Sequence, residues 1–181
     1  MARLFPAAVA ALALAACGHN TTDPFPLEVG FQPLEPCTAA LPGPAPGDPY
    51  PETWTMVAGS AGGHDFAHSR AYVHAALADV WAAMQDPAVC RIHGTNSWGV
   101  EAIGVEPFPM SFVLHYTAGP GIHTVAWEIT YRGGVLESAG DGTPLAYGMR
   151  GQKTWGTSFI DLQSISVGAR PVAGAADVVE L

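Results

Sequence analysis

The stretch from His68 to Pro87, HSRAYVHAALADVWAAMQDP, constrains the fold of this chain more than any other. Its first part, Ser69–His74, predicts a short strand that ends at a turn of small residues. Its second part predicts a helix over Leu77–Gln85, because apolar residues recur there at helical spacing and form one face. The residues of that face are Leu77, Val80, Trp81 and Met84. A helix that follows a strand so closely needs a sheet against which to bury this face.

The helix is predicted to end at Asp86-Pro87, because proline disfavours helical backbone angles in the residue before it. The same pair can start a second, short helix over Ala88–His93, with Asp86 as its N-cap and Pro87 at its first position. The sequence therefore predicts one or two short helices after the first strand.

Downstream, apolar and polar residues alternate. The clearest strand is His123–Arg132, in which Val125, Trp127, Ile129 and Tyr131 share one face. Such alternation indicates a half-buried antiparallel strand. A short piece at Val135–Glu137 lies between glycine-rich turns. Further strands are predicted at Trp98–Glu106, Met110–Thr117, Leu145–Trp155, Thr157–Val167 and Ala176–Leu181.

Residues 1–17 have the pattern of an export signal. Arg3 supplies a positive charge and an apolar run extends to about Leu14, which is short of the ~20 residues of a membrane span. Leu14-Ala15-Ala16-Cys17 resembles a bacterial lipobox, in which Cys17 is acylated. The alternative is an ordinary secretory signal in which Cys17 is incidental. Gly18, in place of an aspartate, favours the outer membrane of the cell envelope as the site of this lipid-anchored protein.

Residues 18–63 are predicted to be a tether. They hold nine of the 16 prolines and five acids, without lysine or arginine. Such a composition favours an extended spacer. Its apolar residues Trp54, Met56 and Val57 are candidates for docking on the folded part. The run Gly59–Gly63 is predicted to mark the boundary, so that residues 64–181 form a single domain.

Charge and motifs exclude several functions. All 16 acids and six of the seven bases follow the signal, which gives the processed chain a charge of 6 − 16 = −10. Nucleic-acid binding needs clustered lysine and arginine, so it is not expected. His64 and His68 lack a third ligand at a diagnostic spacing, and no G-x-S-x-G motif occurs. We therefore assign no metal site, cofactor or catalytic residue.

Cys37 and Cys90 remain beyond the lipidation site. An exported compartment permits a disulfide between them, and two unpaired thiols are equally compatible with the sequence.

The run AYVHAALADVWAAMQDP, residues 71–87, resembles the opening of the START-like superfamily, also called SRPBCC, which includes the birch-pollen allergen and polyketide cyclases. QKTWGTSFIDLQ, residues 152–163, resembles a strand pair of its lipoprotein-like members. The resemblance covers about His64–Leu181. It implies an α+β helix-grip fold, in which an antiparallel sheet of six to seven strands curls round a long C-terminal helix and encloses an apolar cavity. No such helix follows the last predicted strand here, so we expect an open groove.

The resemblance implies that the chain binds a hydrophobic small molecule or lipid. Two alternatives stay open: an enzyme of the cyclase or hydratase type, for which Tyr131, Arg132, Tyr147 and Lys153 are candidate acid–base groups, and a structural lipoprotein without a working pocket. The sequence leaves the oligomeric state open. The predicted cavity residues are Trp81, Phe112, Leu114, Tyr116, Trp127, Ile129, Tyr131, Tyr147 and Met149.

Overall fold

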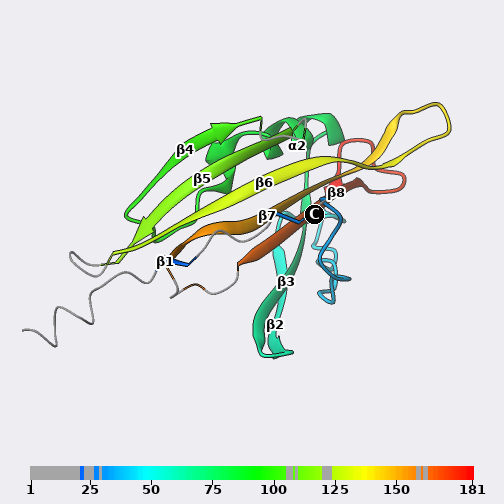
Figure 1. Ribbon diagram of the computed structural model, residues 1–181. Coiled ribbons are helices and arrows are strands. Elements are labelled where there is room, and N and C mark those ends of the chain that lie inside the picture. Colours follow the sequence, from blue (N-terminus) through cyan, green and yellow to red (C-terminus); the bar gives the residue numbers. More distant parts are fainter. Residues whose placement is uncertain are drawn as a thin grey trace, which may run out of the picture.

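The computed structural model describes residues 21–22, 27–28, 30–104, 108, 110–119, 124–157, 160 and 163–181. The predicted signal and Cys17 lie outside these residues. The described strands form an antiparallel sheet with the order β2-β3-β9-β8-β7-β6-β5-β4, and β1 (Thr21–Thr22) pairs with β7. Figure 1 shows β4 to β8 as one twisted layer with the helix α2 above it, while the β2–β3 hairpin points away.

The first hairpin lies across the predicted domain boundary. Strand β2 (Trp54–Ala61) pairs along its whole length with β3 (His64–Val73). Gly62 and Gly63 have φ values of 59° and 83° and form the turn. A Gly-Gly pair at positive φ is a hairpin turn, so the glycine run connects two paired strands where the sequence predicted the end of a tether. Trp54, Met56 and Val57 lie on this hairpin with 69%, 70% and 42% of their surface exposed.

The helices are close to those predicted. Helix α2 spans Leu77–Met84, and the 3₁₀ helix η1 spans Pro87–Cys90. Asp86 is the N-cap of η1, and its side chain accepts a hydrogen bond from the backbone N–H of Ala88 at 2.9 Å. Val80 and Met84 are the buried residues of α2.

The central strands differ in length from those predicted. They are β4 (Ser97–Ile103), β5 (Met110–Ala118), β6 (Val125–Ser138), β7 (Pro144–Thr157) and β8 (Ser164–Pro171), followed by the short β9 (Val179–Glu180). Of these, β5, β6 and β7 are longer than predicted, whereas β4 is shorter and β8 begins at Ser164 instead of Thr157. With β1 and β2, the described sheet has nine strands, against the six or seven expected.

The sequence predicted that the strand ends before Gly133 and Gly134, but β6 continues through both glycines. A Cβ at Gly133 would lie 2.7 Å from the carbonyl oxygen of Gly148 and 3.1 Å from the Trp81 ring. At Gly134 it would lie 2.7 Å from the Phe31 ring. The glycines therefore admit aromatic rings to both faces of a continuous strand, which is a common reason for glycine inside a strand.

One face of the sheet, the core face, carries the buried cluster. The pairs Phe112↔Tyr131, Leu114↔Ile129 and Tyr116↔Trp127 lie opposite each other in β5 and β6, so their side chains share this face. The cluster also contains Met149 and the helix residues Val80 and Met84. The shared face predicted from the alternation is confirmed.

The opposite, outer face is covered by part of the predicted tether. Arg132 has no exposed surface, and its Nε donates to the backbone oxygen of Gly30 at 2.7 Å. The backbone N–H of Glu28 donates to Gln152 Oε1 at 3.0 Å. We call residues 30–38, which continue across this face, the strap. The proline-rich segment thus packs on the sheet.

Trp81, on the helix face predicted to be buried against the sheet, packs against the core cluster but is only half-buried. It stacks on Tyr147, with ring centroids 4.5 Å apart and an interplanar angle of 4°. Trp81→Ala is expected to lower the free energy of unfolding by about 2–3 kcal/mol, because it removes this stack but less buried surface than a core tryptophan provides. Urea unfolding checks it, with the exposed Trp54→Ala as a control expected within about 0.5 kcal/mol of wild type. A similar loss for both variants would contradict the assignment.

Candidate functional site

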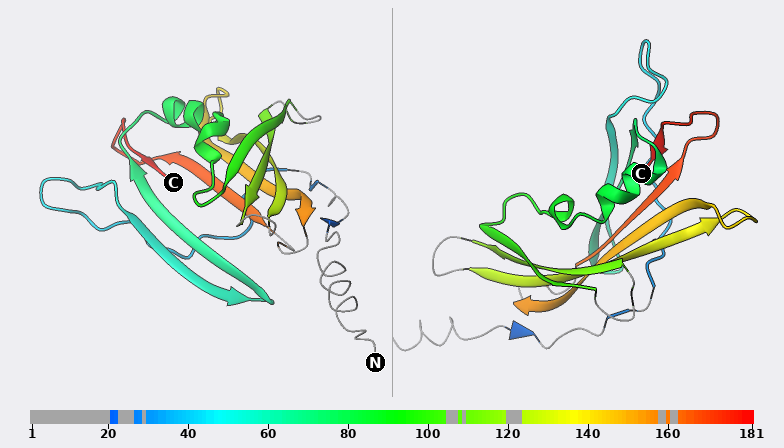
Figure 2. Two further views of the ribbon diagram at one scale, coloured as in Figure 1. Left: turned by 90° about the vertical axis from the view of Figure 1, so that its left-hand side faces the viewer. Right: turned by 90° about the horizontal axis from the view of Figure 1, so that it is seen from above.

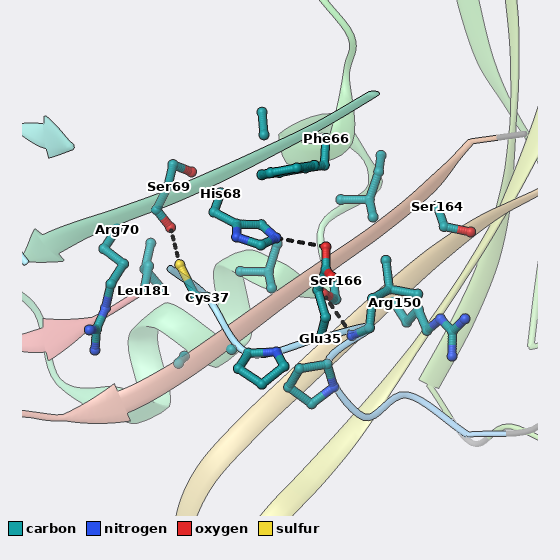
Figure 3. Close-up of a pocket in the computed structure, with 18 of the residues that line it drawn as sticks. Glu35, Cys37, Phe66, His68, Ser69, Arg70, Arg150, Ser164, Ser166 and Leu181 are labelled. Carbon is teal, nitrogen blue, oxygen red and sulfur yellow. Dashed lines mark hydrogen bonds and ion pairs between the residues drawn. The ribbon is translucent and has the colours of Figure 1, made fainter. Parts of the chain in front are cut away.

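The sheet contains a gap. Strand β9 lies between β3 and β8, but it pairs only with Tyr72 and Val73 on one side and Arg170 and Pro171 on the other. Beyond β9, the two strands diverge, as the left view of Figure 2 shows. Between residues 64–70 of β3 and residues 164–169 of β8 lies a groove of about 1270 Å³, which we call the seam groove (Figure 3).

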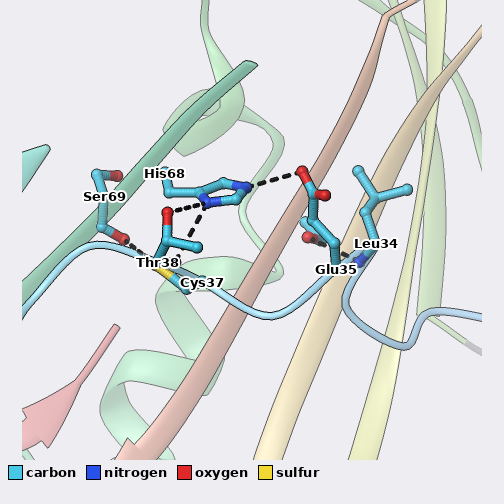
Figure 4. A network of polar contacts seen from close by, with 7 residues as sticks. Leu34, Glu35, Cys37, Thr38, His68 and Ser69 are labelled. Atoms are coloured by element: carbon cyan, nitrogen blue, oxygen red, sulfur yellow. Dashed lines mark hydrogen bonds and ion pairs between the residues drawn. The ribbon is translucent and has the colours of Figure 1, made fainter. Parts of the chain in front are cut away.

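The strap crosses the seam groove on its outer side. At β8, the backbone N–H of Leu34 donates to Ser166 Oγ at 3.2 Å. At β3, the backbone N–H of Thr38 donates to His68 Nδ1 at 3.2 Å, and the Thr38 hydroxyl lies 2.9 Å from the same atom (Figure 4). His68 Nδ1 therefore accepts, which leaves Nε2 to donate to Glu35 Oε1 at 2.8 Å. This network fastens the strap to both strands.

The arginines that line the seam groove are each matched by a carboxylate. Arg70 pairs with Glu180, Arg150 pairs with Glu28, and Arg170 pairs with Glu137. Among the described residues, every arginine that lines the groove is thus paired with an acid, so the groove does not select an anion through a free arginine.

The inner side of the seam groove is apolar. Ile165, Val167 and Ala169 of β8 face the same side as Met149 and Tyr147 of β7. Leu181 also lines the groove and, in addition, lines a neighbouring cleft of about 250 Å³ beneath α2. The cleft is otherwise lined by Val73, Ala75, Asp79, Val80, Ala83, Met84 and Val89. The two hollows meet at one apolar side chain.

The predicted cavity residues divide into two groups. Tyr147 lines the seam groove, and Trp81 stacks on it. The other seven form the packed core: Phe112, Leu114, Tyr116, Trp127, Ile129, Tyr131 and Met149. Their role as cavity wall stays a prediction. Sequence reasoning missed Leu34, Phe66 and Val167, because alternation within a strand does not reveal a gap between strands distant in the chain.

The candidate acid–base groups have structural partners. Burial lowers the pKa of Arg132, and the nearby Arg150 lowers it further, while Glu28 opposes both. Lys153 is buried, and its Nζ donates to the backbone oxygen of Thr157 at 3.1 Å and to that of Ile160. The Lys153 contacts therefore hold the end of β7 and the residue at position 160 together.

A buried polar chain links η1 to the core. Tyr116 donates its hydroxyl hydrogen to the backbone oxygen of Cys90 at 2.7 Å, so that Tyr131 donates to the Tyr116 oxygen at 3.3 Å. Burial raises the pKa of both tyrosines and raises the pKa of the Cys90 thiol to about 11, with a smaller contribution from Asp86.

Of the two alternatives for Cys37 and Cys90, the structure shows two unpaired thiols. Cys37, in the strap, is exposed, whereas Cys90 is half-buried with a raised pKa. Because the thiolate is the reactive form, we expect Ellman's reagent at pH 8 to modify Cys37 at least about tenfold faster than Cys90. The reaction should therefore have a fast and a slow phase, and comparing Cys37→Ala with Cys90→Ala assigns each phase to one thiol. Equal rates, or a native protein without reactive thiols, would contradict this.

The described part of the chain contains no group of three residues that could hold a metal ion. No helix within it has the length and apolarity needed to cross a membrane.

No protein-family model matches the chain, and no curated protein matches it. Among solved structures, a STAR-related lipid transfer protein from Xanthomonas axonopodis (fragment 25–204) matches with a TM-score of 0.48 and 14% sequence identity, over 72% of this chain and 75% of that chain. At this identity, residue roles do not transfer between the two chains.

Proposed function

We propose that this protein binds a hydrophobic small molecule or lipid, and that it does so in the bacterial cell envelope, held to the outer membrane through Cys17. The proposal rests on one observation, the apolar inner side of the seam groove and its continuation at Leu181 into the cleft beneath α2. Ligand pockets are commonly ~300–1,000 Å³ and mostly apolar. The seam groove, at about 1270 Å³, has room for such a ligand.

Transfer of an apolar chain from water to this surface supplies the binding free energy, at roughly 0.8 kcal/mol per buried methylene. Because the lining arginines are already paired with acids, the proposed ligand needs no negative charge. An acyl chain of a lipid or an uncharged apolar molecule fits this lining.

The binding test uses the purified protein and a fluorescent acyl-chain probe, with an organic extract of the denatured protein analysed for retained lipid. Val167→Asp places a carboxylate on the apolar inner side and is expected to weaken probe binding at least about tenfold. Val100→Asp is the matched control, because Val100 is exposed on β4 and lines neither hollow. Equal affinity of the two variants, or no probe binding by the wild type, would overturn the proposal.

The anchor is tested separately. Cys17→Ser is expected to move the protein from the membrane fraction to the soluble fraction as an unprocessed or unlipidated form. A wild-type protein that is soluble and carries no lipid would remove this part of the proposal.

A further inference from the structure

The seam groove is bordered by two strand edges, and on the β3 side the backbone groups point into it. Ala71 exchanges two hydrogen bonds with Leu181, at 3.2 and 3.0 Å, so both of its backbone groups point away from β2. The register of β2 and β3 is regular. In an antiparallel pair this orientation repeats at every second residue, so Ser69, Ala67 and Asp65 also direct N–H and C=O into the groove.

The β8 side is equivalent. The backbone N–H of Val172 donates to the oxygen of Val178 at 2.9 Å, and Arg170 lies opposite Glu180. By the same alternation, Gly168, Ser166 and Ser164 direct their backbone groups into the groove. The backbone N–H of Lys153 in β7 donates to the oxygen of Gln163, just before β8, at 2.8 Å. The intervening residues of β8 therefore direct their backbone groups toward β7. Within the described residues, no strand pairs with either edge beyond β9 and Leu181.

The apex of the groove shows what fits between these edges. Strand β9 lies there between β3 and β8 and is antiparallel to both. The edges are therefore two strand spacings apart at that point, about 9–10 Å. Val179 has no exposed surface and lies on the core face, while Glu180 reaches Arg70 on the outer face. One extended segment thus satisfies both edges, with apolar and polar side chains in alternation.

We propose that the seam groove binds an extended peptide segment, which adds as a strand in line with β9 between β3 and β8. Its inward side chains are apolar, because they meet Ala67, Val167 and Ile165. Its outward side chains are small and polar, because they lie beneath the strap beside His68 and Ser166. A Cβ at Gly168 would meet nothing within 4 Å, so this side has room for them.

Backbone complementarity distinguishes a peptide from an acyl chain at this place. Cys37 Sγ of the strap already donates to the Ser69 oxygen at 3.7 Å. An acyl chain along the two edges would leave the other N–H and C=O groups without partners, and each buried orphan costs about 1–3 kcal/mol. A peptide strand pairs with both rows next to β9, and with one row where the strands diverge, as in other cases of strand addition to a sheet edge. This inference goes beyond the proposed function, whose ligand needs only the apolar inner side.

The test uses a dye-labelled peptide of eight residues with alternating valine and threonine. Its control has the same sequence with a methyl group on every second backbone nitrogen, which removes strand hydrogen bonds and keeps the side chains. We expect the methylated peptide to bind at least about tenfold more weakly, as the loss of several hydrogen bonds implies. Amide hydrogen exchange is expected to show new protection at Ala67, Ser69 and Gly168 with the first peptide alone.

A pair of variants tests the edge itself. Ala67→Pro removes one N–H that faces the groove and spares the pairing with β2, whereas Ala67→Val keeps the N–H. We expect the proline variant to bind the peptide at least about fivefold more weakly than the valine variant. Equal binding of both peptides, or absence of the exchange protection, overturns the inference. Acyl-probe binding without peptide binding also overturns it and leaves the proposed function intact.

Discussion

Gly156→Ala is expected to lower the free energy of unfolding by about 2–5 kcal/mol, the sum of backbone strain and overpacking. Gly156 has a φ of +134°, a backbone angle that residues with a Cβ rarely adopt. A Cβ there would lie 2.5 Å from the carbonyl oxygen of Ala126 and from Trp127. The strain cannot relax easily, because Gly156 pairs with Trp127 next to an irregularity in the β6–β7 ladder.

Urea unfolding of the intact chain measures this effect. Gly99→Ala is the control, because Gly99 lies in β4 and a Cβ there would meet nothing within 4 Å. That variant is expected to be neutral or slightly stabilising. A Gly156→Ala protein as stable as Gly99→Ala would show that the close approach of β7 to Trp127 does not exist.

Raising the pH from 9 to 11 is expected to destabilise the protein strongly. The pKa of the Cys90 thiol is 9.0 when unfolded and about 11 in the folded chain. Between these values the unfolded state binds fewer protons than the native state, so the free energy of unfolding falls as the pH rises. Tyr116 and Tyr131 act in the same direction above pH 10.0, because burial raises the pKa of both.

Thermal unfolding at pH 8, 9, 10 and 11 measures this dependence, and we expect the midpoint to fall by at least about 5 °C. Cys90→Ala should flatten the profile between pH 9 and 10, where the tyrosines contribute little, and Cys37→Ala should leave it unchanged. A midpoint that stays constant up to pH 11, or that falls equally in both variants, would show that the buried chain from Cys90 to Tyr131 does not control it.

The local parts of the fold could be predicted from the sequence because their signals lie within a few residues. Helix α2 begins at Leu77 as predicted and ends one residue early, and Asp86 caps η1 as its position before Pro87 indicated. The core face of β5 and β6 followed from alternation alone, since a period of two fixes which side chains are buried together.

The candidate site could not be predicted in the same way, because it depends on contacts between distant segments. The Gly62-Gly63 turn has the composition of a linker, and only the pairing of β2 with β3 distinguishes the two. The prolines of the strap give no sign that Leu34 bonds to Ser166. The groove exists because β9 pairs with only a few residues of each neighbouring strand, and no residue pattern in β3 or β8 encodes that gap.

The strap also sets an order of folding. Gly30 and Leu34 of the strap bond to Arg132 and Ser166, which lie 102 and 132 positions later in the chain. Glu28, just before the strap, bonds to Gln152, 124 positions later. Contacts of such sequence separation close long loops and slow folding, whereas the β6–β7 hairpin forms from neighbouring residues. On the ribosome, Thr38 can meet His68 of β3 early, but Gly30 and Leu34 have no partners until β6 and β8 have been synthesised. This part of the strap is synthesised early but is among the last segments to dock on the sheet. The nascent chain therefore exposes its proline-rich end throughout most of its synthesis.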